Sequence, residues 1–170
     1  MNKPKISIIV PLFNESESFP LLVDRLNKLA ENFAEEIEIV LIDDGSRDNT
    51  AALMQQVALT NRRYQCVFLA RNFGHQLAVT AGLTVASATE AVLIIDGDLQ
   101  DPPELLPVFY DHYKKGYDVI YAVRKKRKEN KLKKLGYYIF YRILKSISYI
   151  DIPLDSGDFS MLGRNVVDVI

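Results

Sequence analysis

The 170-residue sequence contains a single cysteine, Cys66, and has no run of 18 apolar residues. A lone cysteine cannot form a disulfide within the chain, which fits a reducing compartment and excludes a disulfide-stapled fold. Without a long apolar run there is no candidate for a transmembrane helix, and Pro11 interrupts the first apolar stretch before it could serve as a signal peptide. We therefore expect this chain itself to be soluble and cytosolic.

The sequence also lacks internal repeats and low-complexity linkers, and its composition is ordinary, with 48% hydrophobic and 25% charged residues. This composition excludes a disordered or collagen-like protein. A chain of this length can bury one good core but not two. The expectation is a single globular domain.

Charge is distributed unevenly, although the net charge is only −1. Residues 124–145 hold ten of the 21 lysine and arginine residues and a single acid, Glu129. Such a basic segment is either the solvated face of a helix or a surface for a polyanionic partner such as a membrane or a phosphate ligand.

Short apolar runs alternate with helical patterns over the first 123 residues, which is typical of βαβ units. The fold class predicted is α/β, a three-layer open and mostly parallel sheet with right-handed crossovers. Strands are expected at 6–11, 37–42, 67–70, 91–95 and 119–122, and helices at 18–33, 49–59, 76–86 and 104–115.

The last third of the sequence has a different pattern. Apolar residues at spacings of three and four over 131–150 predict an amphipathic helix whose polar side is basic. A loop with a short strand is expected within 152–162, and a helix begins at Arg164.

Polar side chains follow each of the first four predicted strands. In an open α/β sheet ligands bind outside the carboxyl ends of the strands, so these side chains mark a candidate site. So many carboxylates in one crevice would repel one another unless a cation lay among them. The residues are Pro11, Phe13, Asn14 and Glu15 after the first strand, Asp43 and Asp44 after the second, Arg71, Asn72 and His75 after the third, and Asp96 and Asp98 after the fourth.

The Asp96-Gly97-Asp98 segment is the most specific of these motifs. In extended backbone, residues i and i+2 face the same way, so both carboxylates could bind one Mg²⁺ or Mn²⁺, with Gly97 allowing a diphosphate to approach. The alternative is a simple polar turn, because Asp and Gly both favour turns. The two lone histidines predict no metal constellation, and His75 is better interpreted as a donor in a substrate loop.

Five segments together resemble the GT-A glycosyltransferases of family 2, specifically the polyprenyl-phosphate branch that contains bactoprenol glucosyltransferases and dolichol-phosphate mannosyltransferases. One departure is Gly97, where the resemblance leads us to expect alanine; glycine should loosen the loop. The segments are IIVPLFNE (8–15), VLIDDGSRDNT (40–50), ARNFGHQLAVTAGL (70–83), IIDGDLQDPPE (94–104) and DSGDFSMLGRNVVD (155–168).

The resemblance implies roles for individual residues. Asp96, Asp98 and Gln100 would hold the metal; Pro11, Phe13, Glu15, Asp44 and Arg71 would form the nucleotide site; Arg124 and Arg164 would meet phosphates; and Asp158, with Asp98, would act at the reacting carbon. Each has a structural alternative: Asp44 could close its own turn, Arg124 could be a solvated cation, and Asp158 could be the partner of an arginine.

The implied reaction is an inverting, metal-dependent transfer of a hexose from a nucleoside diphosphate sugar to polyprenyl phosphate at the cytosolic membrane face. UDP-glucose is the favoured donor. Residues 1–123 would form the nucleotide-sugar-binding core, and 124–170 the acceptor-facing and membrane-facing part of the same domain, with the full protein continuing into transmembrane helices. An anionic membrane surface is an expected partner, and nucleic acid is not. The sequence does not fix whether the protein forms a homo-oligomer.

Other functions remain to be separated from this one. A family 2 enzyme that glycosylates a sugar hydroxyl, or a fragment that binds nucleotide without turnover, would share most of these motifs. A phosphohydrolase would continue its D-x-D motif to a threonine, where this chain has Leu99 and Gln100. A dinucleotide oxidoreductase would need G-x-G-x-x-G after the first strand, where this chain has no glycine.

Overall fold

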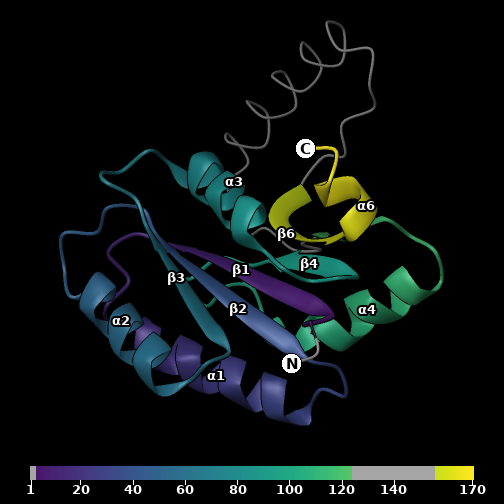
Figure 1. Cartoon of the computed structure of the whole chain (residues 1–170), viewed down its shortest axis with the longest axis horizontal. Helices are drawn as coiled ribbons and strands as arrows, with labels where there is room; N and C mark the ends of the chain where they lie inside the picture. The colour runs from purple at the N-terminus through teal and green to yellow at the C-terminus, as the bar shows by residue number, and fades with distance from the viewer. Residues whose placement is uncertain (1–2, 124–155) are drawn as a thin grey trace, which may run out of the picture. The chain divides into compact units, whose positions relative to one another are not determined.

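The computed structural model describes residues 3–123 and 156–170, and only the backbone of 156–158. These residues form one six-stranded sheet in the order β3-β2-β1-β4-β6-β5 (Figure 1). The strands are β1 (Ile6–Leu12), β2 (Ile37–Asp43), β3 (Tyr64–Phe68), β4 (Ala91–Ile94), β5 (Val119–Val123) and β6 (Ser156–Gly163).

The middle of the sheet is parallel. Strand β1 pairs in parallel with β2, from Ile6 opposite Ile37 to Leu12 opposite Asp43, and also with β4. Every residue of β1 and β2 is buried, as expected for continuous apolar strands covered on both faces. Strand β3 extends the parallel set, whereas β6 runs antiparallel to β4. The predicted α/β class with a mostly parallel sheet is confirmed.

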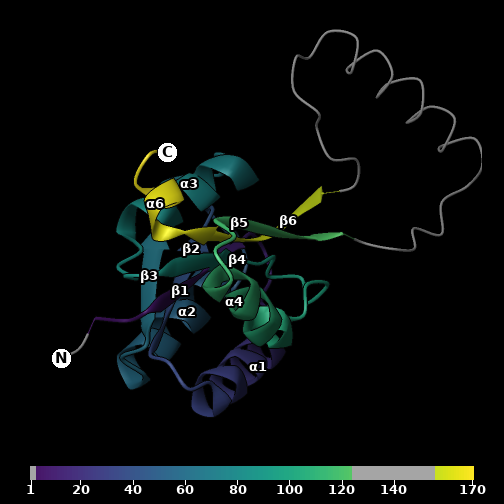
Figure 2. The same ribbon diagram turned by 90° about the vertical axis from the view of Figure 1, so that its right-hand side faces the viewer.

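Helices cover both faces of this sheet, so the predicted three-layer arrangement is also confirmed. Figures 1 and 2 both show α1, α2 and α4 on one face and α3 and α6 on the other. No helix in the described ranges is long and apolar enough to cross a membrane. The helices are α1 (Phe19–Asn32), α2 (Thr50–Thr60), α3 (His75–Val85), α4 (Leu106–Lys114), which follows the 3₁₀ turn η1 (Pro103–Leu105), and α6 (Arg164–Val167).

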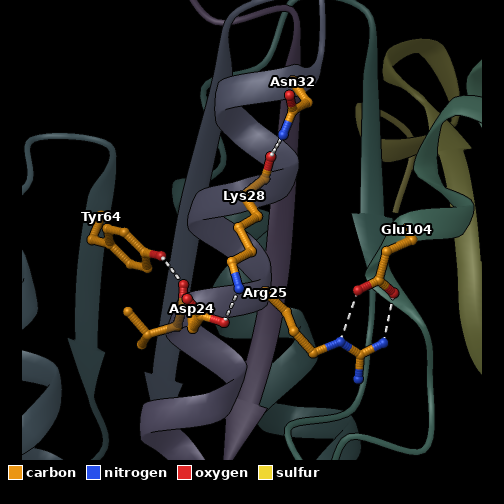
Figure 3. A network of polar contacts seen from close by, with 7 residues as sticks. Asp24, Arg25, Lys28, Asn32, Tyr64 and Glu104 are labelled. Carbon is orange, nitrogen blue, oxygen red and sulfur yellow. Dashed lines mark hydrogen bonds and ion pairs between the residues drawn. The ribbon is translucent and has the colours of Figure 1, made fainter.

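Helix α1 follows the periodicity of its sequence. Pro20 lies in its first turn, where a missing N–H costs nothing, and Leu22, Leu26 and Leu29 are buried on one side. On the other side Lys28 pairs with Asp24, and Arg25 reaches Glu104 (Figure 3). Polar contacts therefore join α1 to the segment that follows β4.

Helix α3 packs unusually closely on the sheet. A Cβ at Gly82 would lie 2.6 Å from Cγ2 of Ile9 and 2.8 Å from Cδ1 of Ile42, so only glycine permits this approach. Ala78 and Val79 are buried in the same interface. Small residues on this helix thus allow it to lie close to the sheet.

Two predicted elements differ from the structure. Strand β3 was expected at 67–70 but begins at Tyr64. The ring of Tyr64 is buried, and its hydroxyl donates a hydrogen bond to Oδ1 of Asn27 at 2.9 Å. Leu69 donates its N–H to the carbonyl of Asp43, and the chain then leaves the sheet. The helix expected at 104–115 starts instead as a 3₁₀ turn after Pro102. The helix expected at 131–150 lies outside the described residues.

A buried carboxylate joins three strands near the amino ends of β1 and β2. Glu38 is 5% exposed, and its two oxygens accept hydrogen bonds from the Ser7 hydroxyl (2.5 Å), the Gln65 amide (2.5 Å), and both the backbone N–H (2.9 Å) and the hydroxyl (2.7 Å) of Ser87. Four donors can offset the cost of burying this charge.

We expect Glu38→Ala to lower the free energy of unfolding by about 2 to 3 kcal/mol, because it leaves buried donors without an acceptor. Glu38→Gln should cost much less, since the Ser87 hydroxyl and the Gln65 amide can turn to accept from its NH₂ group while its oxygen stays on the Ser87 N–H. Urea denaturation measures both variants. Because glutamine keeps the volume of glutamate, equal losses in the two would show that the amide cannot replace the carboxylate in this hydrogen-bond network.

Candidate active site

A cleft of about 290 Å³ opens at the carboxyl edge of the parallel strands. Eight of its twelve lining residues are among those that the sequence marks after the strands: Pro11, Phe13, Glu15, Asp44, Asn72, His75, Asp96 and Asp98. The other lining residues are Leu12, Gly74, Ala78 and Gly97.

The loop after β1 is fastened to the loop after β2. Asn14 adopts a left-handed conformation, φ 56°, which asparagine tolerates better than most residues. Its side chain accepts a backbone N–H of the loop after β2, and three side chains from that loop and the start of α2 accept backbone N–H groups of the loop after β1. The bonds are Asn14 N to Ser46 Oγ (2.9 Å), Arg47 N to Asn14 Oδ1 (2.8 Å), Glu15 N to Thr50 Oγ1 (2.9 Å) and Ser16 N to Asp48 Oδ2 (3.0 Å).

Asp48 also ends the second loop by accepting the N–H of Thr50, at the start of α2, at 3.0 Å. Burial raises the pKa of Asp48, but its hydrogen bonds from Thr50 and Ser16 outweigh that effect and hold the pKa well below its usual range. This contribution to stability is therefore present above the ordinary pKa of 3.8 and is lost as the pH falls through the lower pKa of the folded state.

Asp44 holds the loop that follows β3. Its carboxylate is 3% exposed; Oδ1 accepts the N–H of Phe73 at 2.7 Å and Oδ2 that of Gly74 at 2.9 Å. The turn directly after β2 is closed by its neighbour instead, because Oδ1 of Asp43 accepts the N–H of Ser46. Asp44 therefore does not close its own turn, the structural alternative considered for it, but it does fasten the next loop.

Strand β4 ends at Ile94, and a turn at Gly97 and Asp98 follows, so the Asp96–Asp98 segment is not the extended strand that its spacing suggested. Both carboxylates nevertheless line the cleft. Oδ2 of the buried Asp101 accepts the N–H of Asp96 at 3.2 Å, and Oδ1 of Asp98 accepts that of Gln100 at 3.0 Å. Leu99 adopts φ 66°, a conformation that costs a leucine about 1 to 3 kcal/mol and is often found at functional sites.

The carboxylates of the cleft fit a divalent cation of a particular kind. Among the described residues no three His, Cys, Asp or Glu side chains converge as a complete set of metal ligands. Mg²⁺ commonly takes only one or two carboxylates and completes its shell with water and substrate phosphates. Asp96 and Asp98 suit a cation of that type, bound together with a diphosphate.

Several other predicted site residues are not brought to the cleft. Arg71 stacks its guanidinium over the ring of Phe73, 4.3 Å from the centroid, outside the cleft lining. Gln100 is exposed and does not line the cleft either. Arg124 and the side chain of Asp158 lie outside the described part of the chain.

Arg164 lies at the opposite edge of the sheet from the cleft. Strand β6 is antiparallel to β4, and its last residue, Gly163, pairs with Ala91 at the beginning of β4. The guanidinium of Arg164 donates to the carbonyl of Ala86 at 2.8 Å and pairs with Asp168 at 2.7 Å. Its position gives no support to the expected phosphate contact.

Two of the lining residues that the sequence does not mark, Gly74 and Ala78, lie beside two that it does. Asn72 and Gly74 lie between β3 and α3, His75 begins α3, and Ala78 lies one turn into that helix. Position after a strand was the signal for Asn72 and His75. The signal for Gly74 and Ala78 is weaker, because small residues at a helix start also serve packing against a sheet.

The comparisons with known proteins agree with this geometry. Residues 7–170 match the glycosyl transferase family 2 domain, and the chain belongs to that family. It is 41% identical to the uncharacterized glycosyltransferase YkcC of Bacillus subtilis over 95% of this chain and 50% of that protein. It is 37% identical to the bactoprenol glucosyl transferase of Shigella phage SfV over 98% of this chain and 54% of the phage protein. The chain thus spans about half the length of the curated relatives it matches.

Solved structures with the GT-A fold superpose on this chain. The mannosyltransferase PcManGT of Pyrobaculum calidifontis, in complex with GDP-Man and Mn²⁺, gives a TM-score of 0.69 at 19% identity, covering 99% of this chain and 47% of that one. Glucosyl-3-phosphoglycerate synthase of Mycobacterium tuberculosis, in complex with UDP, gives 0.67 at 18% identity, covering 96% and 58%. The predicted family and fold are confirmed.

The segment that carries Asp96 and Asp98 is held at its far end by an ion pair. Arg25 of α1 contacts Glu104 through two bonds, Nε to Oε1 at 2.8 Å and Nη2 to Oε2 at 2.5 Å (Figure 3). The hydrogen bond from Arg25 lowers the pKa of Glu104 below its usual value. At the near end the Ser18 hydroxyl lies 2.6 Å from Oε2 of Glu15 and 3.4 Å from the carbonyl of Gly97.

We expect a double-mutant cycle of Arg25→Ala and Glu104→Ala to give a coupling energy of about 1 kcal/mol, the upper end for exposed pairs, because the contact is bidentate. The matched control is Asp24 and Lys28, a single-bond pair on the same helix, which should give about 0.3 to 0.5 kcal/mol. Urea denaturation supplies both cycles. A coupling energy no larger than that of the control pair would show that the Arg25–Glu104 pair does not stabilise this segment.

Proposed function

We propose that this chain is the nucleotide-sugar-binding part of a hexosyltransferase that moves glucose from UDP-glucose to polyprenyl phosphate. The observation that carries the proposal is the cleft in which Asp44, Asp96 and Asp98 meet at the carboxyl edge of a GT-A sheet. The glucose and the lipid acceptor are supported by relatives at 36 to 37% identity that are named bactoprenol glucosyl transferases.

The nucleoside is assigned to the residues that follow β1 and β2. Phe13 is 41% exposed in the cleft and offers an aromatic face to a base, with the buried Pro11 beside it. Asp44 keeps acceptor capacity beyond its two backbone bonds, because a carboxylate has about four lone-pair sites. An imide N–H of a uracil base could use one of them.

The transfer itself needs little from a base. An oxygen of the acceptor phosphate attacks the anomeric carbon on the side opposite the diphosphate, and the bond from that carbon to the diphosphate breaks with inversion. Because the acceptor oxygen is already anionic, no strong general base is required, and Asp158 is assigned an orienting role on the acceptor side. When bound to Asp96 and Asp98, Mg²⁺ or Mn²⁺ would stabilise the charge that develops on the leaving diphosphate.

The basic segment at residues 124–145 is assigned to the lipid side. It lies outside the described residues, so its sequence alone supports this role. Each lysine or arginine near an anionic leaflet contributes about 1 kcal/mol, and half of the ten would be enough to recruit the domain to the cytosolic face. Arg124, the first of them, is assigned to a phosphate.

Release of UDP from UDP-glucose, measured with and without a polyprenyl phosphate, tests the function. Release that depends on the lipid phosphate supports the proposal. Release that depends on a sugar with a free hydroxyl instead would assign the chain to polysaccharide synthesis, and UDP binding without any release would make it a binding fragment.

We expect Asp98→Ala to weaken Mn²⁺-dependent UDP binding at least tenfold, because it removes one of the two proposed cation ligands. Stability should change little, because the exposed Asp98 bonds only to the nearby Gln100 N–H among the contacts described for it. Titration calorimetry with and without Mn²⁺ measures the loss. Asp111→Ala, which removes an exposed carboxylate of α4 outside the cleft, is the control. Undiminished binding in Asp98→Ala would refute the metal assignment.

Asp44→Asn should weaken UDP binding about tenfold and destabilise the fold by about 1 kcal/mol, because its NH₂ group must face the N–H of Phe73 or Gly74. Calorimetry and urea denaturation measure the two effects. Asp43→Asn is the matched control: it removes the adjacent buried charge but keeps the oxygen that accepts from Ser46. If both variants bind UDP as tightly as the wild type, the nucleoside does not lie at Asp44.

A further inference from the structure

His75 faces one of the two carboxylates proposed to hold the cation. It is the first residue of α3, and its Nε2 lies 3.7 Å from Oδ1 of Asp96, which is within ion-pair range but longer than a hydrogen bond. Both side chains are about one-third exposed, 35% for His75 and 32% for Asp96. Among the described residues that line the cleft, His75 is the one whose side chain can carry a positive charge.

The backbone of His75 is fixed from both sides. Before it, Asp44 binds the N–H groups of Phe73 and Gly74, and Gly74 has φ 96°. After it, α3 is held on β1 and β2 by the close approach at Gly82. The backbone of His75 therefore cannot move without disturbing the loop or the helix, and the imidazole changes its distance to Asp96 by side-chain rotation alone.

The preceding loop is also packed against the turn after β2. A Cβ at Gly45 would lie 2.4 Å from the carbonyl carbon of Arg71 and 2.6 Å from the nitrogen of Asn72. No side chain other than hydrogen fits between these two backbones. The placement of His75 thus follows from backbone contacts rather than from its own side chain.

A carboxylate that binds a metal works best when a second group fixes its orientation. Such outer partners commonly change metal affinity 10- to 100-fold when they are removed. An imidazole N–H next to a carboxylate oxygen can act in this way in either its neutral Nε2–H form or its protonated form.

We propose that His75 is a positioning residue for Asp96. When the cation binds with the diphosphate, Nε2–H would close the 3.7 Å separation to a hydrogen bond with one carboxylate oxygen and leave the other oxygen available to the cation. This role rests on the proposed function, because it requires a cation at Asp96. It adds to that function a residue that touches neither the nucleotide nor the reacting carbon.

The test compares Mn²⁺ binding in the presence of saturating UDP among variants of this chain. His75→Ala should weaken Mn²⁺ binding at least tenfold, as measured by electron paramagnetic resonance of the free ion. His75→Gln should recover most of the affinity, since its amide nitrogen can reach the position of Nε2 and donate. The control is His112→Ala, which removes the only other histidine, on α4 and outside the cleft lining.

A spectroscopic signature gives a readout that does not depend on affinity. The chain has two histidines and therefore two imidazole Hε1 signals in a proton NMR spectrum, which His112→Ala assigns. With UDP present, substoichiometric Mn²⁺ should broaden the His75 signal strongly and leave the His112 signal sharp.

The outcomes separate this role from the proposed function. Unchanged Mn²⁺ binding in His75→Ala overturns the positioning role, and so does a glutamine variant as weak as the alanine one. A loss of UDP affinity in His75→Ala without any metal would make His75 a nucleotide contact and overturn it as well. If the wild type binds UDP but no Mn²⁺, the metal assignment of the proposed function fails first, and the role of His75 fails with it.

Discussion

Parallel pairing of β1 with both of its neighbours is the constraint on which the site depends. Because β1, β2 and β4 run in the same direction and in matched register, the segments that leave their carboxyl ends emerge side by side. Both faces of these strands are covered, so most of their residues are apolar. Ser7 and Glu38, near the amino ends, are buried as hydrogen-bonded partners, and the other polar side chains lie where the chain leaves the sheet. The crowding of carboxylates at one edge is a direct result.

Hydrogen bonds between side chains and backbone hold the loops around the cleft. Asn14, Asp44, Asp48 and Asp101 each accept a backbone N–H from another part of the loop region. Carboxylates at this edge thus fall into two groups. Asp44, Asp48 and Asp101 accept backbone N–H groups of the loops, and Asp96 and Asp98 lie in the cleft lining.

The layers, the mostly parallel sheet and eight of the twelve cleft residues could be predicted from the sequence, because burial on both faces leaves an apolar signature and polar residues mark each strand end. The start of β3 could not, since Gln65 interrupts the apolar run and the Tyr64 hydroxyl bonds to Asn27 of α1, far away in the sequence. Contacts between the loops could not be predicted from the sequence either. Nothing local in the sequence states that Asp44 binds Phe73, 29 positions away, or that β6 reverses direction and carries Arg164 away from the cleft.

Gly97 was expected to loosen its loop, yet it is buried and its missing Cβ has a specific use. A Cβ there would lie 2.3 Å from Cδ2 of Leu12 and 3.2 Å from the carbonyl oxygen of Pro11. The end of the Leu12 side chain occupies the space that alanine would need. Positions 12 and 97 should therefore covary within the family. Chains with alanine at 97 should carry a smaller or differently shaped residue at 12, so a substitution at either position depends on the residue at the other.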